Sequence, residues 1–375
     1  MRRILFVFGT RPEAIKLCPV IAHMRGNAPD FEARVCVTGQ HRQMLDQVLN
    51  VFDIQPDYDL NVMAPGQSLF DSTARMLSGL GPVLGDKFDL VVVQGDTTTT
   101  LCGSLGAFYS RLPVAHVEAG LRTGDYQHPF PEEMNRVLTT RLTSLHFAAT
   151  EAGAENLRRE GIPDKAIWVT GNPIIDAIQR TSGNLAAGLL SAPPWPWLDP
   201  GKKLIVVTAH RRESFGLPFE RICSALAILS QRPDVQIVYP IHPNPNVRAA
   251  AEKYLKDELN IVLVDPLSYV CFVDLMRRSY LLLTDSGGIQ EEGPSLGKPV
   301  LVMRETTERP EGVAAGLTRL VGTDKATIVA ETSKLLDDPT EYAKMTRPLN
   351  PYGDGHASRR IVEAIRSWFD TRVPE

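Results

Sequence analysis

Short hydrophobic runs alternate with longer amphipathic stretches along the whole chain. This alternation is typical of parallel strands joined by helices that cover the sheet. In the first half the pattern predicts strands at Ile4–Phe8, Ala33–Thr38, Leu90–Gln94, Val114–Val117, Leu145–Ala148 and Ile167–Val169. Helices are expected between the strands, for example at Ala14–Arg25, Gln43–Val51, Thr97–Ser110 and Glu132–Ser144.

A second series of strands occupies the other half of the chain. These strands are predicted at Leu204–Thr208, Ile237–Ile241, Ile261–Val264, Leu281–Thr284, Val300–Met303 and Arg319–Val321. Between the two series, residues 182–202 are rich in Gly, Ala and Pro and are the best candidate for a linker. We therefore expect an α/β protein with two doubly wound, Rossmann-like domains, residues 1–181 and 203–354, that face a central cleft. Residues 355–375 are expected to form one more helix, packed back on the N-terminal domain or on the other one.

Length and composition agree with this picture and exclude several classes of protein. A chain of 375 residues suits two domains, and 43% hydrophobic with 22% charged residues is typical of a globular protein. A net charge of −4 argues against a nucleic-acid partner. The five cysteines have no CxxC spacing, which favours reduced thiols over disulfides or zinc. No hydrophobic run is long enough for an export signal or a membrane span, so we expect a cytoplasmic protein without a membrane partner.

The first predicted strand ends in a segment suited to an anion. Gly9 allows a tight exit from the strand, and Pro12 fits the first turn of a helix. Arg11 and Lys16 bring two positive charges to that helix N-terminus, where free N–H groups already favour an anion. The alternative is an ordinary strand-to-helix turn with two solvated cations.

A second segment of this kind, Asp285–Glu292, follows a hydrophobic strand and opens a helix. Gly287 and Gly288 allow backbone N–H groups to approach a diphosphate closely, next to Ser286. Glu292 lies one turn further on, where a carboxylate can accept both ribose hydroxyls of a nucleotide. The alternative is a helix that Ser286 caps, with Glu292 in a favourable early turn.

Basic residues follow the first strand of the second domain. His210, Arg211 and Arg212 form a cluster suited to a diphosphate, although a solvated basic loop would have the same sequence. His242 follows the next strand and is expected at the same edge of the sheet. Metal-binding spacing of histidines is absent, so no metal is expected.

A tightly bound dinucleotide has no support in the sequence. The nearest match to its glycine fingerprint, Gly79–Gly85, lacks the third glycine at the required spacing and precedes a strand instead of following one. We therefore expect no NAD and no other cofactor.

Carboxylates in the first domain are candidates for general acid–base catalysis. Asp96 follows the third predicted strand and Glu118 follows the fourth, so both are expected at one edge of the sheet. Glu132 and Arg136 stand at positions i and i+4 of one helix face. The structural alternatives are helix capping by Asp96 and a surface ion pair between Glu132 and Arg136.

Five motifs in one order carry a resemblance to a known family: Gly9–Glu13, Gln94–Thr99, His116–Gly124, His210–Glu213 and Asp285–Glu292. From about Ile4 to the stretch Asn350–Gly355, the chain resembles the non-hydrolysing UDP-N-acetylglucosamine 2-epimerases. The resemblance implies a fold similar to that of B-type glycosyltransferases, a homodimer, and a place in the synthesis of cell-surface polysaccharide precursors.

The resemblance also implies roles for particular residues. UDP would be held by Arg11, Lys16, His210, Ser286, Gly287, Gly288, Glu292 and Arg309, with Phe272 near the uracil. Catalysis would fall to Asp96, Glu118 and Glu132, with Arg136 and His210 in support. Leu267 departs from the family pattern, because some relatives carry a polar residue there beside the base. If that contact uses the side chain, base selectivity differs here.

The implied reaction is the reversible inversion of carbon 2 of UDP-N-acetylglucosamine, by loss and re-addition of UDP through a glycal. A second molecule of this substrate would act as an allosteric activator at Gln43, Gln47, Arg212 and His242. The rival interpretations are a UDP-sugar glycosyltransferase, a hydrolysing epimerase that releases N-acetylmannosamine and UDP, and a UDP-sugar sensor. The carboxylates argue against transfer and sensing, since neither needs an acid–base set.

Overall fold

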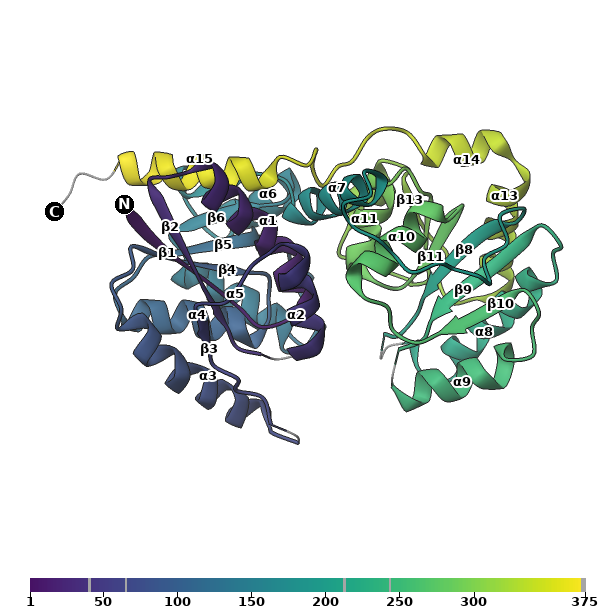
Figure 1. Ribbon diagram of the computed structural model, residues 1–375, viewed down its shortest axis with the longest axis horizontal. Coiled ribbons are helices and arrows are strands. Elements are labelled where there is room, and N and C mark those ends of the chain that lie inside the picture. Colours follow the sequence, from purple (N-terminus) through teal and green to yellow (C-terminus); the bar gives the residue numbers. More distant parts are fainter. Residues whose placement is uncertain (40–41, 65, 212–213, 243, 372–375) are drawn as a thin grey trace. The chain divides into compact units, whose positions relative to one another are not determined.

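The computed structural model describes residues 1–39, 42–64, 66–211, 214–242 and 244–371. The chain divides into two compact units, which we call unit 1 (Met1–Ala177 and Tyr352–Glu375) and unit 2 (Ile178–Pro351). Each unit is a parallel sheet with helices against it (Figure 1). The expected α/β class with two Rossmann-like domains is therefore confirmed.

Unit 1 contains a seven-stranded sheet among the described residues, in the order β3-β2-β1-β4-β5-β6-β7. Its strands are β1 (Arg2–Phe8), β2 (Phe31–Val37), β3 (Tyr58–Asp59), β4 (Leu90–Gln94), β5 (Val114–Ala119), β6 (Leu145–Ala148) and β7 (Ile167–Val169). The helices are α1 (Arg11–Asn27), α2 (Arg42–Val51), α3 (Leu69–Leu84), α4 (Thr98–Tyr109), α5 (Glu132–Leu142), α6 (Glu151–Arg159), the 3-10 turn η1 (Asp164–Ala166) and α7 (Pro173–Ala186).

Unit 2 contains a six-stranded sheet in the part that the structure describes, in the order β10-β9-β8-β11-β12-β13. Its strands are β8 (Lys203–Thr208), β9 (Val235–Pro240), β10 (Ile261–Val264), β11 (Leu281–Thr284), β12 (Val300–Val302) and β13 (Thr318–Leu320). The helices are α8 (Leu217–Ser230), α9 (Pro245–Leu255), α10 (Tyr269–Arg278), α11 (Gly287–Ser295), α12 (Pro310–Ala314), α13 (Lys325–Asp337) and α14 (Pro339–Met345).

Both sheets reverse their strand order once, between β1 and β4 in unit 1 and between β8 and β11 in unit 2. In doubly wound sheets, ligands bind beyond the carboxyl ends of the strands at such a switch point. Four of the five motifs follow these four strands, and the fifth, His116–Gly124, begins in the neighbouring strand β5. The topology therefore gathers the candidate residues of each unit at one edge of its sheet.

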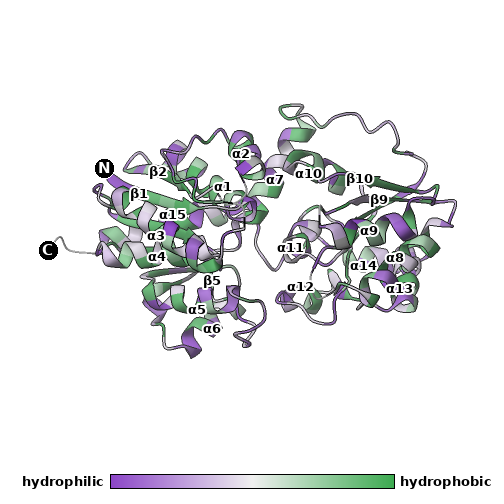
Figure 2. Ribbon diagram, turned by 90° about the horizontal axis from the view of Figure 1, so that it is seen from below, coloured by the Kyte–Doolittle hydropathy of each residue, from purple (hydrophilic) through white to green (hydrophobic). Residues whose placement is uncertain are grey.

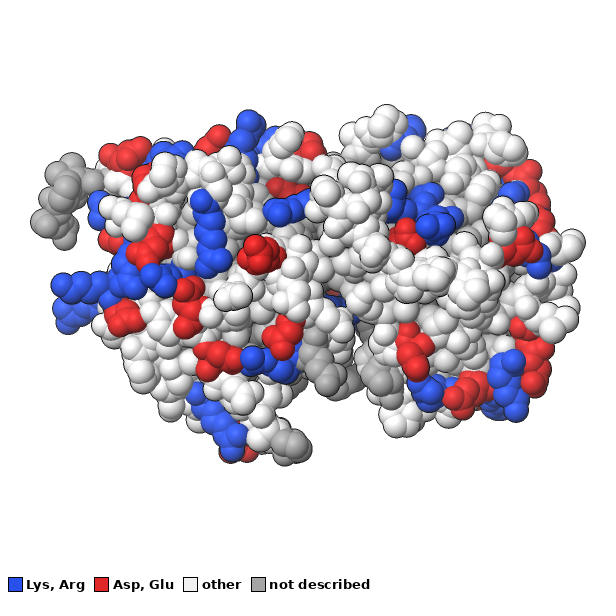
Figure 3. Space-filling view, in the orientation of Figure 1, with Lys and Arg blue, Asp and Glu red and all other residues white. Residues whose placement is uncertain are grey.

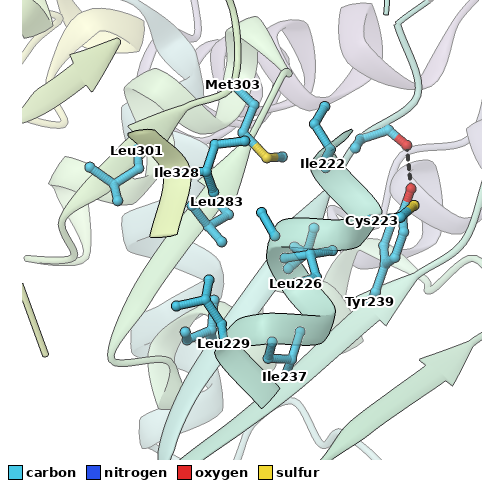
Figure 4. Packing of buried hydrophobic residues seen from close by; sticks show 14 of the residues in the cluster. Ile222, Cys223, Leu226, Leu229, Ile237, Tyr239, Leu283, Leu301, Met303 and Ile328 are labelled. Carbon is cyan, nitrogen blue, oxygen red and sulfur yellow. Dashed lines mark hydrogen bonds between the residues drawn. The ribbon is translucent and has the colours of Figure 1, made fainter. Parts of the chain in front are cut away.

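The central strands are buried on both faces, which explains their nearly continuous hydrophobic sequences. Every residue of Ile4–Phe8 is fully buried, and Figure 2 shows β1 and β5 in the colour of hydrophobic residues. In unit 2 the side chains of Leu226, Ile237 and Leu283 meet between α8 and the sheet (Figure 4). On the face of each unit that Figure 3 shows, basic and acidic side chains are interspersed. None of the described helices is long and apolar enough to cross a bilayer.

The C-terminal helix α15 (Ala357–Asp370) packs against α1 in unit 1 (Figure 1). Asp176 of α7 accepts hydrogen bonds from the first N–H groups of α15, at 3.2 Å from Ala357 and 2.8 Å from Ser358. Near the other end, Arg366 forms a two-pronged ion pair with Asp30. Of the two expected positions for this helix, the one on the N-terminal domain is found.

The expected linker, residues 182–202, is structured in part. Helix α7 runs on to Ala186, and the division between the units falls within this helix. Further along, the indole of Trp195 donates to Asp274 at 2.8 Å, and Gln236 donates to the carbonyl of Trp197. These bonds fix the tryptophan-containing stretch on unit 2.

Candidate functional site

Glu118 lies on a β-bulge at the end of β5. Register against β6 shifts between Val117 and Ala119, so Glu118 is an extra residue in the ladder. Its backbone is left-handed, with φ 63°, which is rare for a residue other than glycine. A bulge redirects the side chain of the inserted residue. The predicted strand ended at Val117, one residue before this irregularity, and its sequence gave no sign of it.

The buried carboxylate of Glu118 has hydrogen-bond donors at both oxygens. Its Oε2 accepts from Lys16 Nζ at 2.5 Å and from the amide of Gln94. Its Oε1 accepts from Asn172 Nδ2 at 3.1 Å. Lys16, which the resemblance assigns to UDP, thus forms a buried ion pair with a candidate catalytic residue. Gln94 and Asn172 had no role in the sequence interpretation.

Asp96 forms an ion pair with Arg136 of α5. The cap of α4 is Thr97, whose hydroxyl accepts from the N–H of Thr100 at 3.2 Å, so the capping role considered for Asp96 is wrong. Asp96 therefore projects from the β4–α4 turn to a cation, where it is available for chemistry.

The buried guanidinium of Arg136 also binds Glu133, at 2.8 Å, and not the expected Glu132. Glu133 is buried and accepts two further bonds of 3.0 Å from the backbone of Thr123 and Gly124. The proposed surface pair of Glu132 with Arg136 is therefore not formed. Glu132 is partly exposed, and its carboxylate makes no hydrogen bond or ion pair with the described part of the chain.

Two buried residues, Glu13 and His116, hold the turns around Asp96. Glu13 accepts from the N–H of Thr10 at 2.7 Å and from the hydroxyl of Thr97 at 2.8 Å, which ties the N-termini of α1 and α4 together. Burial raises the pKa of Glu13. Its pairing with Thr10 forms a capping box, a signal that the sequence T-x-x-E contains.

His116 contacts the turn from β5. Its Nε2 lies 2.7 Å from the carbonyl oxygen of Gly95, to which it donates as a neutral ring. Burial lowers the pKa of His116 to about 3, so the ring is uncharged near neutral pH. The hydrogen bond fixes the residue before Asp96, and a histidine inside a strand gave no sequence signal for this role.

In unit 2, Asp285 organises the basic loop after β8. This fully buried carboxylate accepts from the backbone N–H groups of His210 at 2.6 Å and Arg211 at 2.7 Å. The hydroxyl of Tyr239 donates to the carbonyl of Ala209 at 2.5 Å (Figure 4). The ring of His210 stacks on His242, with centroids 5.2 Å apart and 8° between the planes. Sequence reasoning placed Asp285 in a motif but missed this anchoring role.

The N-terminus of α11 lies beside Arg309. A Cβ at Gly287 would lie 3.2 Å from Arg309 Cζ, so glycine leaves room for the guanidinium there. Arg309 is held by Glu291 at 2.8 Å. Ser286 stands at the N-cap position but makes no side-chain cap, contrary to the capping alternative. Free helix N–H groups beside an arginine form an arrangement suited to phosphate.

Positive charge is concentrated near this helix. Burial raises the pKa of Glu308, but the hydrogen bond from Arg304 and the charges of Arg309, Arg304 and Arg211 outweigh it and lower the pKa to about 2. Three arginines face two carboxylates here, Glu308 and Glu291, which leaves an excess of one positive charge for a diphosphate.

The other predicted residues lie in these elements. Arg11 begins α1, Phe272 lies in α10, Leu267 lies between β10 and α10, and Glu292 is buried in α11. Gln43 and Gln47 lie in α2, and His242 follows β9. Arg212 lies outside the described residues.

Comparison with known proteins assigns a family. The model of the UDP-N-acetylglucosamine 2-epimerase family matches residues 24–366. The UDP-N-acetylglucosamine 2-epimerase of Escherichia coli (strain K12) is 57% identical over 372 residues, which are 97% of this chain and 98% of that protein. The enzyme of Campylobacter jejuni is 50% identical and covers 97% of each chain.

Solved structures agree with this assignment. The UDP-GlcNAc 2-epimerase of Neisseria meningitidis bound to UDP-GlcNAc matches with a TM-score of 0.92 and 47% identity, over 97% of this chain and all of that one. An S. aureus protein solved with UDP matches with a TM-score of 0.90 and 45% identity, over 100% of this chain and 99% of that one.

Proposed function

The chain belongs to the UDP-N-acetylglucosamine 2-epimerase family, and from this premise we propose that it interconverts UDP-N-acetylglucosamine and UDP-N-acetylmannosamine without net hydrolysis. The Neisseria relative, solved with UDP-GlcNAc, supports this choice of substrate. The glycosyltransferase interpretation gives way to the family assignment, which is that of an isomerase. The hydrolysing alternative differs in its products and is tested below.

The route that we propose for the inversion follows from the low acidity of the hydrogen on carbon 2. The hydrogen on carbon 2 is not acidic, because the neighbouring substituents do not stabilise a carbanion. Cleavage of the bond between carbon 1 and the diphosphate oxygen leaves positive charge at carbon 1, and carbon 2 then loses its proton to a carboxylate. The product is a glycal with a double bond between carbons 1 and 2, plus UDP. Re-addition of UDP to carbon 1, with a proton delivered to the other face of carbon 2, completes the inversion.

This route needs cations for the departing diphosphate and acid–base groups for the proton. Unit 2 offers the guanidinium of Arg309, the free N–H groups at the N-terminus of α11, and the imidazole of His210 as a hydrogen-bond donor. Unit 1 offers the acid–base groups. One observation carries the assignment: the carboxylate of Glu118 is buried on a β-bulge and is held by Lys16, a costly arrangement that a purely structural glutamate would not need.

Product analysis separates the two kinds of epimerase. Purified protein is incubated with UDP-GlcNAc alone, and products are resolved by anion-exchange chromatography. We expect UDP-ManNAc in equilibrium with substrate, without accumulation of free N-acetylmannosamine. Stoichiometric release of free sugar and UDP would show a hydrolysing enzyme instead.

We propose in addition that a second molecule of UDP-GlcNAc activates the enzyme through Gln43, Gln47, Arg212 and His242. The stacking of His242 on His210 supports this idea, because a ligand that binds His242 would also affect His210, a candidate contact of the diphosphate. We expect sigmoidal dependence on UDP-GlcNAc and a lag in the reverse reaction that a trace of UDP-GlcNAc removes. Hyperbolic kinetics in both directions, without a lag, would refute the activator.

The assembly that we propose is a homodimer in the cytoplasm. Exposed aromatic side chains of α3 and α4, namely Phe70, Phe108 and Tyr109, offer apolar surface for a second copy. All five cysteines are free thiols, which suits a reducing compartment. Light scattering after size-exclusion chromatography tests the dimer, and a mass near that of the 41.4 kDa chain would contradict it.

A further inference from the structure

Asn172 connects the carboxylate of Glu118 to the backbone of unit 1. It is buried and lies between β7 and α7. Its Oδ1 accepts from the N–H of Ile174 at 3.2 Å, and its Nδ2 donates to Glu118 Oε1 at 3.1 Å. Since the backbone N–H of Ile174 requires the oxygen of the amide, the NH₂ group must face the carboxylate. The orientation of the amide is therefore determined by its surroundings.

The backbone of Asn172 is held in turn by the chain that returns from unit 2. Its N–H donates to the carbonyl of Tyr352 at 2.7 Å. The close approach favours glycine at position 171, where a Cβ would lie 3.3 Å from Gly353 Cα, whereas a Cβ at Gly353 would be in ordinary contact, 3.5 Å from the nitrogen of Asn172. Both glycines have positive φ, of 83° and 137°. Residues 180 positions apart in the sequence therefore fix one another.

The two oxygens of Glu118 have different donors. Lys16 and Gln94 both donate to Oε2, whereas the amide of Asn172 donates to Oε1. A carboxylate held at one oxygen still rotates about its last bond, and a donor at the other oxygen stops this rotation. Proton transfer from carbon depends steeply on such geometry, and misplacement by about 1 Å costs on the order of 100-fold in rate.

We propose that Asn172 is a positioning residue for Glu118, and that the returning segment Tyr352–Gly353 sets the place of Asn172. This inference rests on the catalytic role proposed for Glu118. It gives the far C-terminal part of the chain a function in the reaction besides its contribution to the fold.

The test uses Asn172→Asp and Asn172→Ala in the full-length protein. Aspartate has nearly the same shape and still accepts from Ile174, but it puts a carboxylate oxygen where the NH₂ donor faced Glu118, so the contact changes from attraction to repulsion. Alanine removes the donor without adding charge. We expect kcat to fall by roughly 10- to 100-fold for both variants, while KM stays within about threefold. Calorimetric UDP binding gives the concentration of folded protein, so that partial misfolding is not mistaken for lost turnover.

Asn260→Asp is the matched control. The amide of Asn260 also donates one short bond, of 2.7 Å to the carbonyl of Ser230, but it lies in unit 2 beside β10. We expect this variant to lower Tm without lowering kcat. An equal loss of kcat in Asn260→Asp and Asn172→Asp would show that the loss comes from lower stability of the protein, and this result would overturn the proposal.

A double-mutant cycle with Glu118→Gln separates this inference from the proposed function. If Asn172 acts through Glu118, Asn172→Ala costs little further turnover once Glu118 is Gln. If Glu118→Gln alone keeps wild-type turnover, the catalytic assignment of Glu118 fails. If Glu118→Gln is impaired but Asn172→Ala alone retains full kcat, positioning by Asn172 is wrong. It is also wrong if Asn172→Ala lowers kcat by the same factor in the Glu118→Gln background as in the wild-type protein.

Gly353→Ala tests the second half of the proposal. Gly353 has a φ of 137°, which residues with a side chain rarely adopt, so an added methyl group strains the backbone beside Asn172, and kcat should fall severalfold with KM unchanged. In the Asn172→Ala background the same substitution should have little further effect. Unchanged kcat in Gly353→Ala would show that the returning segment does not set the position of Asn172.

Discussion

Each of the three candidate carboxylates has different surroundings. Glu118 is buried and accepts from Lys16, Gln94 and Asn172, and Asp96 is paired with Arg136. Glu132 lies at the start of α5, and its carboxylate has no hydrogen bond or ion pair with the described residues. A general acid or base must be held within hydrogen-bond reach of the atom that loses or receives the proton. The protein therefore holds the carboxylates of Glu118 and Asp96 in place, and we expect bound substrate to position the carboxylate of Glu132.

Replacement of each carboxylate by its amide should lower turnover by roughly 100-fold or more, the usual scale for the loss of a general acid or base. The affinity for UDP should change much less, because most of the nucleotide contacts are assigned to unit 2 and none to these three carboxylates. Steady-state kinetics and calorimetry of Asp96→Asn, Glu118→Gln and Glu132→Gln measure both quantities. Turnover within a few-fold of wild type in all three variants would refute the catalytic assignment.

His116 predicts a pH dependence of stability. Burial lowers its folded-state pKa from 6.5 to about 3, so below pH 6.5 the unfolded chain takes up a proton that the native state does not. Native stability therefore falls as the pH decreases from 6.5 towards 3, by about 2 kcal/mol from this group at pH 5. Urea unfolding of His116→Gln should show a shallower loss between pH 7 and 5. His356→Gln, which changes an exposed histidine, should keep the wild-type slope.

At the scale of elements, the strand ends determine where the chemistry lies. Strands β4, β6, β7, β10 and β11 have the bounds that the sequence predicted, because each is a short, mainly hydrophobic run between polar turns. The two-residue β3 and the helix α3 were not predicted. The bulge was not predicted either, because Glu118 interrupts the hydrophobic pattern and is predicted to follow the strand, whereas the strand continues to Ala119. The choice of Glu133 over Glu132 as partner of Arg136 depends on tertiary packing, which helix spacing alone does not give.

The turn after the bulge requires Gly120. A Cβ there would lie 2.1 Å from the carbonyl oxygen of Gly153, and φ is 87°. Gly124 also has positive φ, of 78°, but its Cβ would meet nothing within 4 Å. Gly124→Ala should cost about 1 kcal/mol for the backbone conformation, and Gly120→Ala about 1–3 kcal/mol more for the clash. Equal free energies of unfolding in urea would contradict this account of the turn.

At the scale of the whole molecule, the chain crosses from unit 1 to unit 2 and returns. The return ends in α15, whose buried face includes Ile361 and Ile365. This arrangement makes the C-terminal helix part of the unit that carries the candidate carboxylates. A substitution that weakens the packing of α15 is therefore expected to lower the stability of unit 1 and to leave that of unit 2 unchanged.

Ile361→Ala should destabilise unit 1 by about 2–5 kcal/mol through the cavity it leaves. Hydrogen exchange followed by mass spectrometry should show faster exchange in α1 and the strands of unit 1, with little change in β8–β13. Leu336→Ala, at a buried position of α13 in unit 2, is the control and should give the reverse pattern. Faster exchange in both units for Ile361→Ala would contradict the assignment of α15.

The central claim is that carbon 2 loses its hydrogen as a proton and regains one from a group that exchanges with water. The most direct test follows UDP-GlcNAc and the purified protein in deuterated water by proton NMR, without added cofactor or acceptor. The account predicts UDP-N-acetylmannosamine with deuterium at carbon 2. Formation of the manno epimer with its original hydrogen at carbon 2 would contradict elimination through a glycal.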